Sequence, residues 1–555
     1  MTKYATHCSV YKTPQSAPVP GTTQVPNDAG GYGWKVDKWT RAERFLILGN
    51  EGGSYYAGER ELTVDASAAI EECARESADR LLALLISIST KGRAAKVDPV
   101  IFALARMAAC KGAIAERAAT AIPVICRTGT HLLQFCNSVE QLGGWSMPVR
   151  NGVNQWFLGK SPDDLAYQVT KYQQRDGWAM ADVLRRTHPK TTDPQMQSVF
   201  RWIVGKPMSA LSIDRKGVVK VYGELPPPPM IIQAMTEAMS TTDPNTWVRL
   251  IRDHRLVREH LPTAALNSIA VWDALLLDMP LTAMIRNLGK MTSLGLLKPL
   301  SDASQYVVSR LRDRELLRRA RVHPVTLLLA LMTYKNGHGI KGKLSWQPVQ
   351  PIVTALDDAF YAAFEFVPPT NKRQLLALDT SGSMTGPALM GTITPREASA
   401  AMALVTANCE PNYHIIAFSD VLRPLNKFCA GIRLPAAIEM VSGLPFGGTD
   451  CALPCLYALQ HKLDVDTFVI YTDSQTWCGK EHTYQALNRY RKARNPNAKM
   501  AVVAMLANSH TLADPNDPGM MDLIGFDTIL PRVLSDFVSD GVSSTASEDV
   551  DGASE

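Results

Sequence analysis

Apolar residues recur at three- and four-residue spacing from Thr40 to about Phe366, and this pattern changes to short β-rich runs after Pro368. Glycines and prolines divide the first part into short segments, each of which can bury its apolar face only against its neighbours. We therefore expect an α-solenoid of HEAT-like helix pairs. The predicted helices are 62–89, 98–108, 111–124, 164–172, 231–239 and 324–334, and residues 218–229, which end in four prolines, are predicted to form an extended connector.

The part after Pro368 alternates predicted strands with predicted helices. The strands are 374–378, 414–418, 467–471 and 500–506, and the helices include 396–409 and 484–494. Strands that alternate with helices form a parallel sheet with helices on both faces. The predicted fold class is therefore multidomain α and α/β, an α-solenoid followed by a doubly wound, Rossmann-like domain.

Hard oxygen donors stand at the ends of these predicted strands. In an open parallel sheet, ligands bind at the carboxyl ends of the strands, and carboxylate and hydroxyl oxygens suit Mg²⁺ or Mn²⁺. The donors predicted to hold a divalent cation are Asp379, Ser381, Ser383, Thr449 and Asp473. The alternative is a vestigial site in which hydrogen bonds alone hold the loops together.

The order and spacing of these donors resemble the metal-ion-dependent adhesion site of von Willebrand factor type A domains. The resemblance implies that Ser381, Ser383 and Thr449 bind the metal directly, and that Asp379 and Asp473 bind it directly or through water. It also implies one open position for an acidic group of a partner protein. Mg²⁺ is the expected cation, with Mn²⁺ and Ca²⁺ as alternatives.

Residues 337–343 match the first seven positions of a phosphate-binding P-loop, but Leu344 replaces the hydroxyl that would hold Mg²⁺. The segment before this loop is predicted to be a helix, and Trp346 and Pro348 follow where a helix should begin. A glycine-rich basic turn is therefore the favoured interpretation. No hydrolase triad, H-E-x-x-H motif or paired catalytic carboxylate is found, so we expect the protein not to be an enzyme.

The net charge of +5 conceals an asymmetry between the two parts of the chain. Residues 1–370 carry 44 Lys and Arg against 33 Asp and Glu, whereas residues 371–555 carry 14 against 20. A polyanion is therefore expected to bind the first part.

Three clusters in the first part combine cations with other groups that bind nucleic acid. Residues 171–178 interleave Lys171 and Arg175 with aromatic and amide side chains, and are followed by Arg185 and His188. Lys171 and Arg175 are four residues apart, which predicts that they share one helical face. The same spacing relates Arg286 to Lys290, and residues 310–321 hold six arginines. Cations neutralise phosphates and rings stack on unpaired bases, although a solvated helix face is the alternative for each cluster.

Other features indicate the cellular setting. The longest apolar run is far shorter than the roughly 20 residues of a membrane span, and residues 1–30 show no signal peptide. The ten cysteines include no CxxC pair and are expected to be reduced thiols. A cytoplasmic protein is expected.

Several segments of the chain resemble the Ro ribonucleoprotein autoantigen family, whose members carry the TROVE module. The similarity extends over about residues 28–540. The matching segments are 30–32, 51–56, 170–178, 254–260, 279–292 and 334–346, and in the second part 379–384, 447–451 and 511–527. We accordingly expect a flexible segment over 1–27, the TROVE domain over 28–368, the type A domain over 369–540 and a disordered acidic tail over 541–555.

The resemblance implies a ring of helical repeats closed by the type A domain. Small non-coding Y RNAs would bind the outer surface, and single-stranded 3′ ends of misfolded or structured RNAs would enter a basic central hole. By position, Lys171, Arg175 and His188 correspond to RNA-contacting residues, and Arg185, Arg286 and Lys290 are further candidates. The bacterial relatives work with 3′ exoribonucleases in RNA maturation and decay, so such an enzyme is an expected partner.

We therefore predict a monomeric, non-enzymatic RNA-binding scaffold for RNA quality control, maturation or decay. The alternative is a metal-dependent protein-interaction module in which the type A domain is the main activity and RNA binding is incidental.

Overall fold

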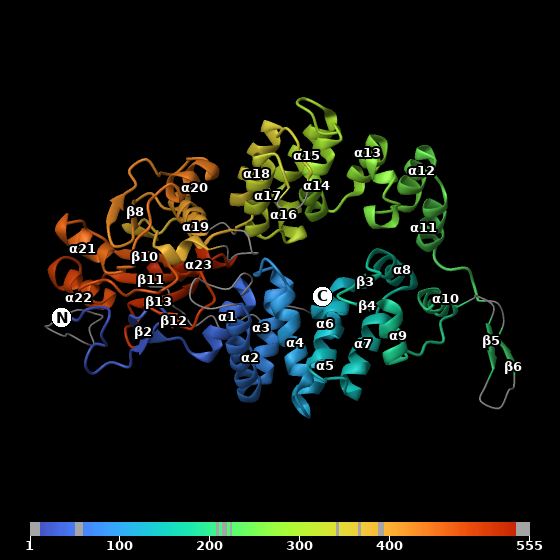
Figure 1. Ribbon diagram of the computed structural model, residues 1–555, viewed down its shortest axis with the longest axis horizontal. Coiled ribbons are helices and arrows are strands. Elements are labelled where there is room, and N and C mark those ends of the chain that lie inside the picture. Colours follow the sequence, from blue (N-terminus) through green and yellow to red (C-terminus); the bar gives the residue numbers. More distant parts are fainter. Residues whose placement is uncertain are drawn as a thin grey trace.

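The computed structural model describes residues 12–49, 59–206, 210–213, 219–222, 225–339, 343–364, 368–386 and 393–539. Its helices follow two arcs that face each other, with the α/β domain at one end (Figure 1). This arrangement confirms the predicted ring-like α-solenoid followed by a doubly wound domain. The first arc consists of α1 (Lys38–Leu48), α2 (Glu59–Glu76), α3 (Ala78–Lys91), α4 (Asp98–Ala109), α5 (Ala113–Ile125), α6 (Gly129–Gln141), α7 (Met147–Leu158), α8 (Pro162–Lys171), α9 (Met180–Thr187) and α10 (Pro194–Ile203).

Local capping explains where the first helices begin and end. The predicted helix 62–89 is two helices, because Ser77 leaves the helical conformation and its side chain accepts a hydrogen bond from the Arg80 amide. Gly92 ends α3 in the left-handed conformation that glycine adopts readily. Not every proline divides two segments, since Pro123 lies inside α5.

The second arc returns towards the α/β domain. In chain order the hairpin of β5 (Ala210–Ile213) and β6 (Val219–Tyr222) connects the two arcs, and it projects beyond their end (Figure 1). The predicted extended connector is therefore partly a strand. The second arc consists of α11 (Met230–Ser240), α12 (Pro244–His254), η1 (Arg258–His260), η2 (Ala265–Asn267), α13 (Ile269–Asp278), α14 (Leu281–Ser293), α15 (Asp302–Arg312), α16 (Arg314–Ala320), α17 (Pro324–Asn336) and α18 (Gln350–Ala362).

The two arcs touch at both ends. Near the α/β domain, the ring nitrogen Nε2 of His323 lies 3.1 Å from the carbonyl oxygen of Arg93. At the other end, the rings of Tyr167 on α8 and His260 on η1 pack edge to face at 6.1 Å. The helices therefore form a closed circuit. The apolar side chains that they bury form two core clusters, one mainly in each arc, and the cluster of the second arc continues into the α/β domain.

The α/β domain contains a six-stranded sheet in the order β13-β11-β10-β7-β8-β9, in which only the edge strand β9 runs antiparallel. The strands are β7 (Gln374–Asp379), β8 (Tyr413–Phe418), β9 (Leu422–Pro424), β10 (Thr467–Thr472), β11 (Lys499–Ala504) and β13 (Met520–Ile524). The helices are η3 (Gly382–Thr385), α19 (Pro395–Cys409), α20 (Leu434–Ser442), α21 (Leu453–Gln460), α22 (Thr483–Ala493) and α23 (Leu530–Val538). The predicted strands and helices of this part are confirmed.

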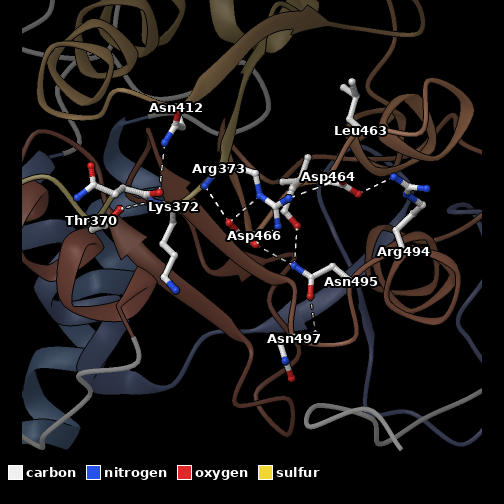
Figure 2. Close-up of polar contacts among 12 residues, drawn as sticks. Thr370, Lys372, Arg373, Asn412, Leu463, Asp464, Asp466, Arg494, Asn495 and Asn497 are labelled. Atoms are coloured by element: carbon white, nitrogen blue, oxygen red, sulfur yellow. Dashed lines mark hydrogen bonds and ion pairs between the residues drawn. The ribbon is translucent and has the colours of Figure 1, made fainter.

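Polar contacts at the amino ends of β7 and β10 fix how these neighbours align (Figure 2). The Arg373 guanidinium donates to Asp466 at 2.7 Å and lies 3.7 Å from Asp464, which also pairs with Arg494. In this register Gln374 lies opposite Thr467 and Leu378 opposite Tyr471. Asp379 and Asp473, which follow directly at the carboxyl ends, are thereby brought to the same edge of the sheet.

The amino-terminal residues are packed against the α/β domain, so the expectation of a flexible segment over 1–27 is wrong for residues 12–27. The buried Gln15 side chain donates to Asp450 at 2.8 Å and to the Glu481 carbonyl at 2.9 Å. Strands β1 (Val25–Pro26), β2 (Tyr32–Lys35) and β12 (His510–Thr511) then form a small antiparallel sheet. Composition could not reveal this packing, because the contacts join residues at opposite ends of the sequence. Residues 1–11 and the tail predicted over 541–555 lie outside the described residues.

Candidate functional site

The five predicted metal donors all lie at the carboxyl edge of the sheet and are buried. They come from the end of β7, from η3 with the residue before it, from the loop before α21 and from the residue after β10. Their exposed fractions are 0% for Asp379, 1% for Ser381, 3% for Ser383, 1% for Thr449 and 1% for Asp473.

Hydrogen bonds bring four of these donors into one cluster. Asp379 accepts from the Ser381 amide at 2.9 Å, and the hydroxyl oxygens of Ser381 and Ser383 are 3.2 Å apart. Ser383 also donates to Asp473. Thr449 is joined through its backbone, since its carbonyl oxygen accepts from the Trp477 amide at 3.1 Å in the loop that follows Asp473.

The electrostatics of the cluster fit a cation. Burial and then the neighbouring charge of Asp379 raise the pKa of Asp473 to about 7, and burial also raises the pKa of Asp379. The oxygen Oδ2 of Asp473 is buried and has no hydrogen-bond partner among the described residues. No group of three His, Cys, Asp or Glu side chains that could hold a metal is found in the described part, so hydroxyl oxygens would have to complete the ligand set. Two buried carboxylates with adjacent hydroxyls suit Mg²⁺ or Mn²⁺.

A buried arginine beside this cluster escaped the sequence analysis. Arg396, in the first turn of α19, donates to the carbonyl oxygens of Thr380 and of Leu444. Burial lowers its pKa, and the charge of Asp379 acts in the opposite direction. No local motif marks this residue, because its partners come from two other loops.

Exposed apolar side chains lie on loops beside the candidate metal site. Among the described residues of the α/β domain, the large apolar side chains that are exposed are Val421, Phe446 and Trp477, at 51%, 71% and 42%. A Cβ atom built on Gly382 would lie 3.8 Å from the Phe446 ring, and one on Gly448 would lie 3.0 Å from Trp477. Phe446 and Trp477 therefore belong to loops that carry or contact the metal donors.

Lys171 and Arg175 of the first cationic cluster do not share one helical face, so that prediction is wrong. Helix α8 ends at Lys171, and Arg175 lies in the two-residue strand β3 (Gln174–Arg175), which pairs with β4 (Trp178–Ala179). Asp176 and Gly177 at the turn both have positive φ, as expected for an Asp-Gly hairpin turn. The hairpin places Arg175 at an exposed edge, where it pairs with Asp176 at 3.4 Å.

Lys171 is held by aromatic side chains. Its ammonium nitrogen donates to the Tyr167 hydroxyl at 3.0 Å and lies 5.1 Å from the Tyr167 ring centre and 5.3 Å from that of Tyr172. Burial alone would lower the pKa of Lys171, but the Tyr167 hydrogen bond and neighbouring negative groups raise it above its ordinary value. The side chain is therefore a positioned cation.

The remaining predicted residues of this cluster follow the hairpin. Arg185 lies on the exposed face of α9 and pairs with Asp182, and His188 ends α9 in the left-handed conformation. Nearby, the rings of Trp178 and Trp145 lie 5.8 Å apart. Cations and indole rings are thus combined on one surface.

The second and third clusters are only partly free for a ligand. Arg286 is exposed on α14, whereas Lys290, one turn later, lies 3.3 Å from the Asn267 side-chain oxygen. The arginines of 310–321 are divided between α15 and α16, and three of them bind within the protein: Arg310 to the Met279 carbonyl, Arg312 to Asp358 and Arg318 to Glu315.

A pair of arginines from opposite arcs was also missed. Burial and then the charge of Arg321 lower the pKa of Arg127, which precedes α6. The Nε atom of Arg127 is buried, and within the described residues it has no hydrogen-bond partner. Only the closure of the circuit brings these two cations together. The sequence marks Arg321 as one of the six arginines of 310–321, but it carries no signal for the pairing with Arg127.

None of the helices among the described residues is both long enough and apolar enough to span a bilayer.

Comparison with known proteins assigns each of the two parts of the chain to a known domain family. The family model for the TROVE domain matches residues 25–226 and 248–333, and that for the Ro60 vWA domain matches residues 373–538. The RNA-binding protein RO60 of Deinococcus radiodurans is 37% identical over 519 residues, which cover 93% of this chain and 95% of the relative. The RNA-binding protein RO60 of Caenorhabditis elegans is 35% identical, with 93% and 90% covered. The crystal structure of the D. radiodurans RO (RSR) protein matches with a TM-score of 0.67 and 36% identity, covering 91% of this chain and all of that one.

Proposed function

The chain belongs to the Ro60 family of TROVE proteins, and from this membership we propose that it is an RNA-binding scaffold. The observation that carries the proposal is the surface formed by the end of α8, the β3–β4 hairpin and α9, called here the hairpin surface. It presents the cations Lys171, Arg175 and Arg185 beside the indole rings of Trp145 and Trp178. Cations supply affinity for phosphates, and aromatic faces stack on bases.

The finer proposal divides RNA binding between two places. A small Y-like RNA binds the outer hairpin surface, with His188 beside the cations. The single-stranded 3′ end of a misfolded or structured RNA enters the space between the two arcs. Arg127 and Arg321 support this second site, since they form a cationic pair to which no carboxylate is bonded among the described residues.

The scaffold is proposed to be non-enzymatic and to act in RNA quality control, maturation or decay. A single predicted cation held by hydroxyl and carboxylate oxygens differs from the two-metal sites common in nucleases. A 3′ exoribonuclease would then supply the chemistry, and a monomer in the cytoplasm is proposed.

The test compares a structured RNA with and without a single-stranded 3′ tail at two salt concentrations. We expect tighter, salt-sensitive binding of the tailed RNA, and weaker binding with a flatter salt slope for the double variant Lys171→Ala/Arg175→Ala. Arg249→Ala is the control, because that exposed arginine lies on α12, outside the hairpin surface, and pairs with Glu237 and Asp253. Equal, weak binding of both RNAs by the unaltered protein would contradict the proposal.

A second function is proposed for the type A domain, because exposed apolar side chains gather at its candidate metal site. Phe446 and Trp477 would contact a large apolar side chain of a partner protein, while a neighbouring carboxylate of that partner completes the coordination of a bound Mg²⁺. Exposed apolar patches of this kind mark protein interaction sites.

A random peptide library displayed on phage provides the test. Peptides are selected for binding to the whole chain in the presence of Mg²⁺ and are eluted with EDTA. This selection is expected to enrich peptides with an acidic residue beside a large apolar one. Phe446→Ser and Trp477→Ser should lose these peptides, whereas Val64→Ser, at an exposed valine of α2, should retain them. Peptides that bind equally well in EDTA would contradict this function.

A further inference from the structure

A small cavity lies where α8 meets the segment from the end of α12 to α14. Its volume is about 260 Å³. Apolar side chains form much of its wall, including Leu256, Leu275 and Met279, and the Tyr167 ring faces it from α8. This volume lies just below the roughly 300–1,000 Å³ of typical small-molecule sites, which suits a single planar ring system.

Polar groups of both signs line the same cavity. Lys171, Arg255 and Arg258 contribute cations, and Arg255 is held in the left-handed conformation at the end of α12, with φ +51°. Glu259 and Asp278 contribute carboxylates. Glu259 pairs with Arg258 at 3.3 Å, whereas Asp278 forms no ion pair or side-chain hydrogen bond with the other described residues. The buried Asn287 also lines the cavity, and its side-chain oxygen accepts a hydrogen bond from Arg258 at 3.3 Å.

We propose that this cavity binds one unpaired nucleobase of the RNA, and that it favours a base with an exocyclic amino group. The inference rests on the proposed RNA-binding function, which it extends to a subsite. The apolar wall and the Tyr167 ring receive the flat base, as aromatic side chains do in single-strand-binding proteins. Lys171 and Arg255 at the rim neutralise the phosphates on either side of it.

The two carboxylates account for the base preference. Carboxylate oxygens only accept hydrogen bonds at neutral pH, so Glu259 and Asp278 pair with amino groups such as that of cytosine. Uracil presents oxygen acceptors where cytosine and adenine present amino groups, and it would leave the Asp278 carboxylate without a hydrogen-bond donor. The carboxylates also disfavour a purely anionic ligand, and the charged groups disfavour a purely apolar one.

The experiment measures the affinity of the full chain for three twelve-nucleotide strands: oligocytidine, oligouridine and an abasic ribose-phosphate strand of equal charge. We expect oligocytidine to bind about tenfold more tightly than the other two. Ala283→Leu fills the cavity and should remove this advantage without weakening oligouridine binding, and Asp278→Asn should reduce the advantage. Ala303→Leu is the matched control, because this helical alanine has similar exposure and lines none of the cavities described here.

Equal binding of oligocytidine and the abasic strand, or an oligocytidine advantage that survives Ala283→Leu, would overturn the inference while leaving RNA binding intact. Loss of binding for every strand would instead contradict the proposed function on which the inference depends.

Discussion

Gly92 at the end of α3 lies against Arg321 at the end of α16. A Cβ atom built on Gly92 would come within 3.2 Å of the Arg321 Cβ and 3.7 Å of its carbonyl oxygen. Both residues have positive φ, so the contact joins two helix ends that each turn sharply. It closes the circuit of helices at the point where the two arcs and the α/β domain meet.

This contact predicts that Gly92→Ala destabilises the protein more than an equivalent change elsewhere. Alanine at a left-handed position costs about 1–2 kcal/mol, and at Gly92 the new methyl group also presses on Arg321. Gly143→Ala is the matched control, since Gly143 ends α6 in a Schellman motif with φ +67° and its Cβ would meet nothing within 4 Å. Urea unfolding should give a larger loss for Gly92→Ala, and equal losses would show that the closure tolerates the methyl group.

Most of the fold could be predicted from local patterns. Helical spacing located segments such as 98–108, and strand ends followed by oxygen donors located Asp379 and Asp473, because these signals lie within a few residues. The five donors meet at one edge because parallel strands share their carboxyl ends. The helical-face prediction for Lys171 and Arg175 failed because the Asp-Gly turn between them overrides helical spacing with a hairpin.

What could not be predicted depends on contacts between distant parts of the chain. Gln15 is buried by loops of the α/β domain, and Arg396 is held by carbonyl groups of two other loops. Arg127 and Arg321 approach each other only because the circuit closes. Sequence periodicity describes which face of an element is apolar, but it does not say which remote element will cover that face.

Buried histidines predict how stability depends on pH. Burial lowers the pKa of His131, His260 and His323 to about 4 from the ordinary 6.5. As pH falls below 6.5 the unfolded chain takes up protons that the folded chain does not bind, so folding stability is lost progressively towards pH 4. Urea unfolding at pH 7 and pH 5 should show this loss.

His323→Gln should make that loss shallower. Glutamine can replace both contacts of the neutral ring, accepting from the Val325 amide and donating to the Arg93 carbonyl, but it does not titrate. His188→Gln, at an exposed histidine, is the control and should keep the original pH dependence. An unchanged loss in His323→Gln would show that His323 does not contribute to it.

Removal of divalent cations is predicted to destabilise the type A domain. Mg²⁺ at 100 times its Kd would stabilise the folded protein by about 2.7 kcal/mol. The shift on adding Mg²⁺ should be larger at pH 8 than at pH 6, because the pKa of about 7 for Asp473 means that the cation must displace a proton at the lower pH. Thermal unfolding with Mg²⁺ or EDTA measures the shift.

Two variants distinguish the loss of a metal ligand from the loss of any negative charge as the cause of a change in the Mg²⁺ shift. Asp379→Asn should abolish the Mg²⁺ shift, whereas Asp420→Asn, in a neighbouring loop that carries none of the five donors, should keep it. A shift that persists in Asp379→Asn would place the cation elsewhere.

Arg127→Gln is predicted to weaken RNA binding while stabilising the free protein. In the free protein Arg127 is partly desolvated and close to the charge of Arg321, so removing one charge relieves repulsion. Bound RNA would supply a phosphate between the two guanidinium groups, and the variant loses that contact.

For single strands the slope of log K against log salt should then fall by about 0.7 per lost phosphate contact. The loss should be confined to RNA with a single-stranded 3′ tail, measured by fluorescence anisotropy at two salt concentrations. Arg249→Gln should change neither property. Equal weakening of tailed and tailless RNA would show that Arg127 does not distinguish the 3′ end.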